Sequence, residues 1–362
     1  MTGVAPTTSH ESPAQLPDGW KTSAPEAVDL DSRRLGAVVD WLDRLPNQNL
    51  HSLLVARRGI LAFEHYRKGA DERWRDPLPD AQHGIAVKHD LRSATKSVTG
   101  LLAGIALERK DIPSLDAPMF AYFPEYADLR TPEKDRITLR HLLTMSAGLD
   151  WDENVPDTDP RHGEMRMWRE ADHLRVALKP PVVAAPGEIW NYSGGCSELI
   201  GAIVRKATGK PLDAFAREAL FEPLGITDTE WAQHAAGSHS ASGGLRMRSR
   251  DLAKIGQLVA AHGCWNGRAI VPARWIEESI APQIGAADRI WFYGYHWWLG
   301  RSLVGRKEFT WASAIGFGGQ RLYVVPGLEL VVAITAGHYA DAMQGWLPSV
   351  VLNRFILPAV RA

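Results

Sequence analysis

The sequence contains only two cysteines, Cys196 and Cys264, which lie far apart in its 362 residues. Two such cysteines cannot form a disulfide framework, which excludes the small disulfide-stabilised folds, and we expect both thiols to be buried. No stretch approaches the roughly 20 apolar residues that a membrane-spanning helix requires. The first residues carry neither a basic nor an apolar segment of the secretory type. We therefore expect a cytoplasmic protein that does not bind membranes.

Neither sign of charge is in excess, because 41 Lys and Arg balance 42 Asp and Glu to a formal net charge of −1. This balance excludes an overall basic surface for nucleic acid, so a small-molecule ligand is the better expectation. No phosphate-loop or dinucleotide-binding glycine pattern is present, and we predict no cofactor. The 13 histidines form neither His-Glu-x-x-His nor a Cys/His ligand set, so we predict no metal site. Both a monomer and a homodimer are compatible with the sequence.

Hydrophobic patterning predicts a helical middle between two β-rich ends. Asp31 can cap a helix whose apolar residues recur at helical spacing, and Ser52–Ala56 and Ile60–His65 form an expected hairpin. A second hairpin is expected over 321–335 and a closing helix over 342–357. The clearest helical segments between the ends are 93–108, 138–146, 196–208 and 212–220.

These elements predict an α+β fold in which strands from both chain ends build one antiparallel sheet. We divide the chain into an N-terminal arm (1–27), an α/β domain (28–89 and 231–362) and an inserted, mainly helical domain (90–230). A ligand cleft at the junction of the two domains would be natural.

The segment from Leu91 to Leu102 contains the first catalytic candidate pair, Ser93 and Lys96. Residues three apart on a helix share a face, so the lysine amine can reach the serine hydroxyl. Desolvation by the apolar residues that follow would lower the pKa of Lys96 and make it a base near neutral pH. A helix-capping serine beside a solvated lysine is the simpler alternative, although Lys96 is the only lysine with a serine three residues before it.

Two later segments add candidates. Tyr192 lies on a loop before a helix expected from Cys196, where its phenol can relay a proton or simply pack. The glycine-rich run around Gly316 precedes a β-rich segment, and its glycines would let a substrate approach the strand closely. A free N–H on such an edge strand would be the second donor of an oxyanion hole, after the N–H of Ser93; a glycine bulge is the alternative.

The order of these motifs resembles that of the β-lactamase-like, penicillin-recognising serine hydrolases, which carry serine-x-x-lysine, a tyrosine motif and a glycine strand in turn. Within that family the chain is most similar to the branch of 6-aminohexanoate-oligomer hydrolases and β-lactamase-like esterases. The resemblance covers nearly the whole chain and implies the β-lactamase/transpeptidase-like fold. It extends to the segments 141–149, 223–226, 243–245, 250–252, 293–298 and 316–320.

The resemblance also implies roles for individual residues. Ser93 would form an acyl-enzyme, Lys96 would accept its proton, and Tyr192 would assist proton transfer to the leaving group. The backbone N–H groups of Ser93 and Phe317 would hold the oxyanion. If the strand alignment slips, Ile315 replaces Phe317 in that role.

Two departures from the family's pattern bear on the substrate. Gly194 stands where the tyrosine motif usually has an asparagine, and Ala314 stands where penicillin-binding relatives have a cation, for which Arg321 is a candidate replacement. Both losses argue against efficient turnover of β-lactams or D-Ala-D-Ala peptides. They leave hydrolysis of small esters or linear amides as the leading hypothesis.

Further substrate-binding candidates are Gly316, Asp150 and Trp298. Asp150 begins an acidic run that could attract an amine-bearing substrate, and Trp298 belongs to an aromatic cluster over 291–298 that could wall the pocket. A solvated loop and core packing are the respective alternatives. Three hypotheses therefore stand: an esterase or amidase, a β-lactamase or D-alanyl peptidase, and a catalytically silent binding protein of the same fold.

Overall fold

A nine-stranded sheet forms the centre of the computed structural model, which describes residues 12–287, 290–339 and 341–361. All neighbouring strands in it are antiparallel except β1, which runs parallel to β3. The strands, in spatial order, are β1 (Lys21–Thr22), β3 (Ile60–Tyr66), β2 (Leu50–Arg57), β16 (Leu330–Ala336), β15 (Gln320–Val325), β14 (Lys307–Gly316), β13 (Trp298–Val304), β12 (Trp291–Tyr293) and β11 (Ile284–Ala286).

Helices from the two chain ends cover one face of this sheet. Helix α1 (Ser32–Arg44) begins as predicted, because the Asp31 side chain accepts hydrogen bonds from the backbone N–H groups of Arg33 and Arg34. It packs beside α10 (Met343–Val350), a π-helical turn (Val351–Ile356) and α11 (Leu357–Ala359). Their apolar side chains and those of the central strands form one buried cluster.

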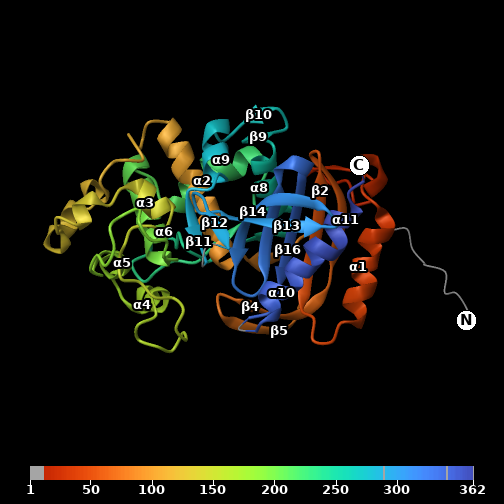
Figure 1. Ribbon diagram of the computed structural model, residues 1–362, viewed down its shortest axis with the longest axis horizontal. Helices are drawn as coiled ribbons and strands as arrows, with labels where there is room; N and C mark the ends of the chain where they lie inside the picture. Colours follow the sequence, from red (N-terminus) through yellow and green to blue (C-terminus); the bar gives the residue numbers. More distant parts are fainter. Residues whose placement is uncertain (1–11, 288–289, 340, 362) are drawn as a thin grey trace, which may run out of the picture.

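The opposite face carries α2 (Thr95–Glu108) and α8 (Ser249–Ala260), and α8 packs directly on β15 and β16. A β-carbon at Gly256 would lie 2.6 Å from a side-chain atom of Val331, so this glycine lets α8 approach the sheet closely. Beyond α2, helices α3 (Leu139–Leu143), α4 (Gly163–Arg169), α5 (His173–Leu178) and α6 (Gly194–Thr208) are grouped away from the sheet (Figure 1). Helix α7 (Leu212–Ala216) packs against α6.

The described residues also form three small sheets that we did not predict. One is the hairpin of β4 (Lys68–Arg73) and β5 (Asp76–Gln82), and the second joins β6 (Lys88–Asp90), β8 (Leu245–Arg248) and β7 (Glu230–Trp231). The third pairs β9 (Cys264–Trp265) with β10 (Arg268–Ala269), and α9 (Ala273–Ser279) follows it. Because β6 ends three residues before Ser93, the second of these sheets bears directly on the site.

Several local expectations need adjustment. The predicted helix at 93–108 begins with a 3-10 turn (Arg92–Ala94), so α2 itself starts at Thr95. Cys196 is buried as expected, but Cys264 is exposed, so our expectation for that thiol was wrong. Residues 1–11 of the predicted arm lie outside the described residues, while Trp20 within it is buried. Among the described helices, none has the length and apolar character that crossing a membrane requires.

Candidate functional site

The structure brings Ser93 and Lys96 into direct contact at the start of α2. Lys96 Nζ donates a hydrogen bond to Ser93 Oγ at 3.0 Å and a second one to the backbone carbonyl of Ser242 at 2.8 Å. The lysine is 2% exposed, so its amine is held by these two acceptors instead of by solvent. Arg92, just before the serine, has a φ of +50°, a left-handed conformation that side-chain-bearing residues rarely adopt. Ser93 is therefore presented on a strained turn.

Tyr192 lies on the loop before α6 and reaches the same pair. Its ring centroid is 5.0 Å from Lys96 Nζ. Ser193 caps α6 by accepting a hydrogen bond from the Cys196 N–H at 3.2 Å, which fixes the end of the loop. The Tyr192 ring also stacks on Trp298, with centroids 5.6 Å apart. Trp298 therefore packs against the tyrosine as well as lining the cavity described below.

The end of β14 lies against the segment that precedes Ser93. A β-carbon on Gly316 would lie 2.1 Å from the carbonyl oxygen of Leu91, so only glycine permits this approach. The neighbours of Gly316 on both sides, Ile315 and Phe317, line the cavity together with Ser93. Gly316 thus acts through its lack of a side chain, and both oxyanion candidates line the same cavity as Ser93.

These residues open onto a cavity of about 760 Å³. Asp150, one of our substrate-binding candidates, is exposed and is not among the described residues that line this cavity. Glu153, three residues later in the same acidic run, does line it. The wall is formed by Trp74, Arg75, Asp90, Arg92, Ser93, Glu153, Asn154, Val155, Pro156, Asp157, His162, Glu164, Met165, Trp168, Tyr192, Ala232, Gly243, Gly244, Trp298, Ile315 and Phe317.

A family model described as "Beta-lactamase" matches residues 52–342 of the chain. The chain belongs to the beta-lactamase family. It is 29% identical over 220 residues to esterase EstB of Burkholderia gladioli, a match that covers 56% of this chain and 53% of the esterase. The chain thus spans about half the length of that curated relative.

Two further relatives match over more of their length. The 6-aminohexanoate-dimer hydrolase of Paenarthrobacter ureafaciens is 23% identical over 331 residues, which cover 86% of this chain and 78% of the hydrolase. The solved structure of a putative 6-aminohexanoate-dimer hydrolase from Bacillus anthracis superposes with a TM-score of 0.71 at 20% identity, covering 86% of this chain and 79% of that one. This match confirms the predicted β-lactamase/transpeptidase-like fold.

The Glu153 carboxyl lies directly against Gly194. Its Oε1 accepts hydrogen bonds from the Gly194 N–H and from Trp151 Nε1, both at 2.6 Å. A β-carbon on Gly194 would lie 3.0 Å from that oxygen, closer than such contacts ordinarily are. Burial and the nearby Glu164 carboxylate raise the pKa of Glu153 to about 7. A carboxyl with a pKa of about 7 thus lies next to Gly194.

The charge state of Lys96 differs from our expectation. Desolvation acts to lower the pKa of Lys96, as predicted, but Tyr192 and the carboxylates of Glu164 and Glu153 raise it to about 12. Because burial raises the pKa of Tyr192 as well, the tyrosine is a neutral phenol near neutral pH. The two carboxylates then stabilise the ammonium, so Lys96 is protonated in the free protein at neutral pH. The apolar neighbours of Lys96 on the helix favour a neutral amine. The carboxylates that favour the ammonium come from other segments, so the sequence near Lys96 does not reveal them.

A buried carboxylate that we did not predict, Glu198 on α6, organises the loop that holds Lys96. It accepts hydrogen bonds from the side chains of Ser240 and Ser242 and from the backbone N–H groups of Ala241 and Ser242. Although burial opposes its charge, the neighbouring His234 ring and these serine hydroxyls lower the pKa of Glu198 to about 2. The loop so fixed presents the Ser242 carbonyl to Lys96.

The family's substrate-anchoring cation has no replacement in Arg321. That guanidinium is buried and donates to the backbone carbonyls of Gly316 and Gln320 at 3.3 and 2.8 Å. It is not among the described residues that line the cavity, so our suggestion for Arg321 was wrong. Arg321 instead braces the turn that carries Phe317. Among the residues that the structure describes, the arginines that line the cavity are Arg75 and Arg92.

Proposed function

We propose that this protein is a serine hydrolase that cleaves small esters or linear amides through an acyl-enzyme on Ser93. The observation that carries the proposal is the 3.0 Å hydrogen bond from Lys96 Nζ to Ser93 Oγ at the wall of a 760 Å³ cavity. A structural helix cap would not need a buried lysine on the serine hydroxyl. The similarity to an esterase and to a 6-aminohexanoate-dimer hydrolase supports the same class of reaction.

In the first half-reaction Ser93 Oγ bonds to the substrate carbonyl carbon while its proton passes to the neutral form of Lys96. The carbonyl oxygen becomes an oxyanion, which the backbone N–H groups of Ser93 and Phe317 stabilise, with Ile315 as the alternate donor. The C–O or C–N bond to the leaving group then breaks, and the leaving group receives a proton relayed through Tyr192. Water attacks the acyl-enzyme, the acid departs, and Ser93 regains its proton.

The neutral amine that this reaction needs is a minor species near neutral pH, because the pKa of Lys96 is raised to about 12. Acylation should therefore become faster as the pH rises through the alkaline range. Protonation of Glu153, whose pKa lies at about 7, removes one of the charges that hold the lysine proton. The carboxylates next to Lys96 thus control the pKa of the amine that acts as the base.

The residues that line the cavity favour an ester or a linear amide over a β-lactam as the substrate. It presents apolar and aromatic surface from Trp298, Met165 and Trp168, and carboxylates from Glu153 and Glu164. Arg75 and Arg92 also line the cavity, but each is paired with a carboxylate, Asp157 and Glu72 respectively. The carboxylates of the wall repel the acidic group that β-lactams carry and attract an amine. The asparagine and the strand cation that would hold a β-lactam are replaced by Gly194 and Ala314. We propose a small-molecule ester or amide, including an amine-bearing one, as the substrate.

The test is a substrate panel measured on wild type and Ser93→Ala. It contains p-nitrophenyl acetate and butyrate, linear aminohexanoate oligomers, and nitrocefin. We expect turnover of the esters or oligomers that the variant loses, with nitrocefin the slower substrate. Nitrocefin turnover faster than that of both other classes would instead favour a β-lactamase. No turnover of any substrate by folded wild type would favour a silent binding protein.

A further inference from the structure

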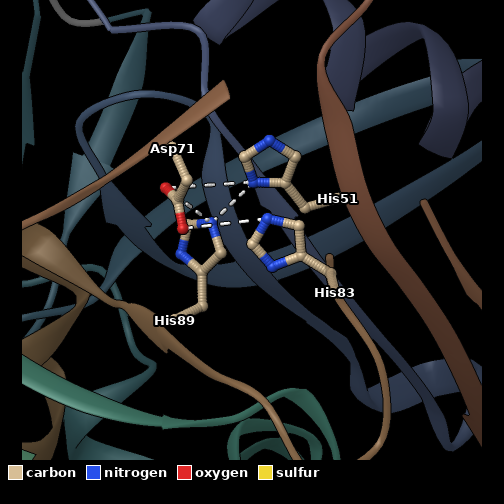
Figure 2. Close-up of side chains that lie close together, drawn as sticks. All are labelled: His51, Asp71, His83 and His89. Carbon is tan, nitrogen blue, oxygen red and sulfur yellow. Dashed lines mark hydrogen bonds and ion pairs between the residues drawn. The ribbon is translucent and has the colours of Figure 1, made fainter. Parts of the chain in front are cut away.

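Four side chains away from the serine converge on one buried point. They are His51 on β2, Asp71 on β4, His83 just after β5 and His89 on β6 (Figure 2). Each offers one ligand atom, and the four atoms lie within 4.8 Å of one another. The closest pair is His51 Nδ1 and His89 Nε2, at 2.8 Å.

The outer nitrogens of two of these histidines fix where their protons sit. Asn49 Nδ2 donates to the carbonyls of Ala70 and Gly337, so Asn49 Oδ1 faces His51 Nε2 as an acceptor at 3.0 Å. His89 Nδ1 lies 2.9 Å from the carbonyl oxygen of Asp90, which can only accept. Each outer nitrogen therefore carries the proton of its neutral ring. His51 Nδ1 and His89 Nε2 then face each other with two lone pairs, which repel unless a cation lies between them.

The ligand atoms of the other two members, His83 and Asp71, also face the centre of the cluster. His83 Nε2 is buried without a hydrogen-bond partner and lies 3.8 Å from Asp71 Oδ2. Asp71 Oδ1 is 3.3 Å from His89 Nε2 and accepts a hydrogen bond from the Tyr339 hydroxyl at 2.8 Å. An unpaired imidazole nitrogen whose side chain is only 5% exposed requires a partner that hydrogen bonds within the protein do not supply.

The backbone around the cluster is shaped to hold its outer hydrogen bonds. A β-carbon on Gly69 would lie 2.0 Å from Asn49 Oδ1, and one on Gly337 would lie 2.4 Å from Asn49 Nδ2. Side chains at either position would displace the amide that orients His51. A histidine that binds a metal through one ring nitrogen usually donates a hydrogen bond from the other, which fixes the orientation of its ring.

We propose that His51, His83, His89 and Asp71 bind one Zn²⁺ ion. Three imidazole nitrogens and one carboxylate oxygen are zinc ligands, and tetrahedral bonding at 2.0–2.1 Å sets them about 3.3 Å apart. The separations of 2.8, 3.3, 3.8 and 4.0 Å measured between members of the set bracket that value. Four protein ligands leave no open position, so the site is structural. This inference departs from our sequence-based expectation of no metal site.

A second histidine cluster, His173, Glu198 and His234, shares some of these features. Its two histidine rings stack with centroids 4.0 Å apart, as do the rings of His51 and His83, and both ring nitrogens of His234 are buried without a hydrogen-bond partner. The Glu198 oxygens, however, already accept four hydrogen bonds from the loop at 240–242, which explains the burial of this carboxylate without an ion. We therefore assign no metal there.

The zinc site would fasten the β4–β5 hairpin to the central sheet and to the segment that leads to Ser93. Along the described part of the chain, β4 and β5 pair only with each other, and most of β5 is exposed. Yet Trp74 and Arg75 at the tip of this hairpin line the substrate cavity. His89 precedes Ser93 by four residues, and Tyr339, which binds Asp71, also stacks under Arg92. The ion would thus set the cavity wall without touching the substrate.

The direct test is metal analysis of the full-length protein, purified without a metal-affinity tag. We expect about one zinc per chain by plasma mass spectrometry, and a zinc-dependent rise in melting temperature after removal of the metal by a chelator. The paired variants are His83→Asn and His262→Asn; the second histidine is 61% exposed and serves as the control. Zinc affinity should fall in His83→Asn by more than the ~10- to 100-fold that loss of an outer-shell partner costs, and stay unchanged in the control.

A second measurement keeps the proposal testable if His83→Asn does not fold. Co²⁺ added to the metal-free wild type should give the intense visible bands of a tetrahedral site, and zinc should displace them. Ser93→Ala should bind zinc like the wild type, which separates this site from the hydrolase chemistry. Equal zinc affinity in His83→Asn and the control would overturn the proposal, as would metal-free wild type that binds neither Zn²⁺ nor Co²⁺.

Discussion

The Glu153 carboxylate lies directly against Gly194, with Oε1 2.6 Å from the glycine N–H and 3.0 Å from where a β-carbon would stand. A side chain at residue 194 would therefore require the Glu153 carboxyl to shift by a few tenths of an ångström. Because Glu153 is also one of the groups that raise the pKa of Lys96, this contact links residue 194 to the electrostatics of the Ser93–Lys96 pair.

Glu153→Gln should shift the pH dependence of kcat/KM. The Glu153 carboxylate is one of the groups that raise the pKa of Lys96, so its removal lowers that pKa and increases the neutral amine at a given pH. The ascending limb of the profile should move to lower pH, as measured with p-nitrophenyl butyrate. Asp150→Asn, which removes an exposed carboxylate from the same loop, is the matched control and should leave the limb in place. A limb that stays in place or moves to higher pH in Glu153→Gln would contradict this assignment.

Tyr192→Phe should lower kcat by about 10²- to 10⁴-fold, the range typical of a lost proton-transfer group. The ring that stacks on Trp298 at 5.6 Å is retained, so the melting temperature should change little. Tyr293→Phe makes the same chemical change on a buried neighbour that packs on Trp298 but is not among the described cavity-lining residues. Comparable losses of kcat in the two variants would show that Tyr192 has no special role.

Gly316→Ala should reduce kcat because its β-carbon would meet the Leu91 carbonyl at 2.1 Å and push the end of β14 away from Ser93. Loss of one oxyanion donor costs about 10²- to 10³-fold in kcat, which is the expected scale. Gly327→Ala is the control, since no atom lies within 4 Å of a β-carbon built there. Steady-state kinetics of both variants test this prediction. A near-wild-type kcat in Gly316→Ala would show that the end of β14 does not form part of the oxyanion site.

Glu198→Gln should destabilise the protein by about 2–3 kcal/mol, because hydrogen bonds to a buried charged acceptor are worth more than those to a neutral one. The folded-state pKa of about 2 lies below the ordinary carboxyl value of 4.5. The wild-type stabilisation is therefore full above pH 4.5 and is lost as the pH falls through 2. Denaturant unfolding of both proteins at pH 7 and near pH 3 should show a smaller difference at the lower pH. An equal difference at both values would mean that charge is not the cause.

Much of the fold could be predicted because its signals are local. The Asp31 cap, the hairpin over 52–65 and the helix containing Lys96 each depend on residues that are close in the sequence. The β4–β5 hairpin escaped prediction because β5 contains two prolines and polar residues and is mostly exposed, which disfavours a strand on pattern alone. Its stability depends on tertiary partners.

The site shows the same division between local and long-range signals. The three-residue spacing of Ser93 and Lys96 is local, and the acidic run at 150–153 drew attention to the right loop, although the residue that lines the cavity is Glu153. Glu198 and the cluster of His51 and His89 could not be found by spacing. Their partners come from strands and loops that are distant in the sequence and meet only in the fold.

The role of Ser93 as the nucleophile is tested most directly by intact-protein mass spectrometry during turnover of p-nitrophenyl butyrate. Wild type should carry a butyryl adduct that peptide mapping places on Ser93 and that is absent in Ser93→Ala. An adduct on another residue, or undiminished turnover by Ser93→Ala, would contradict that role.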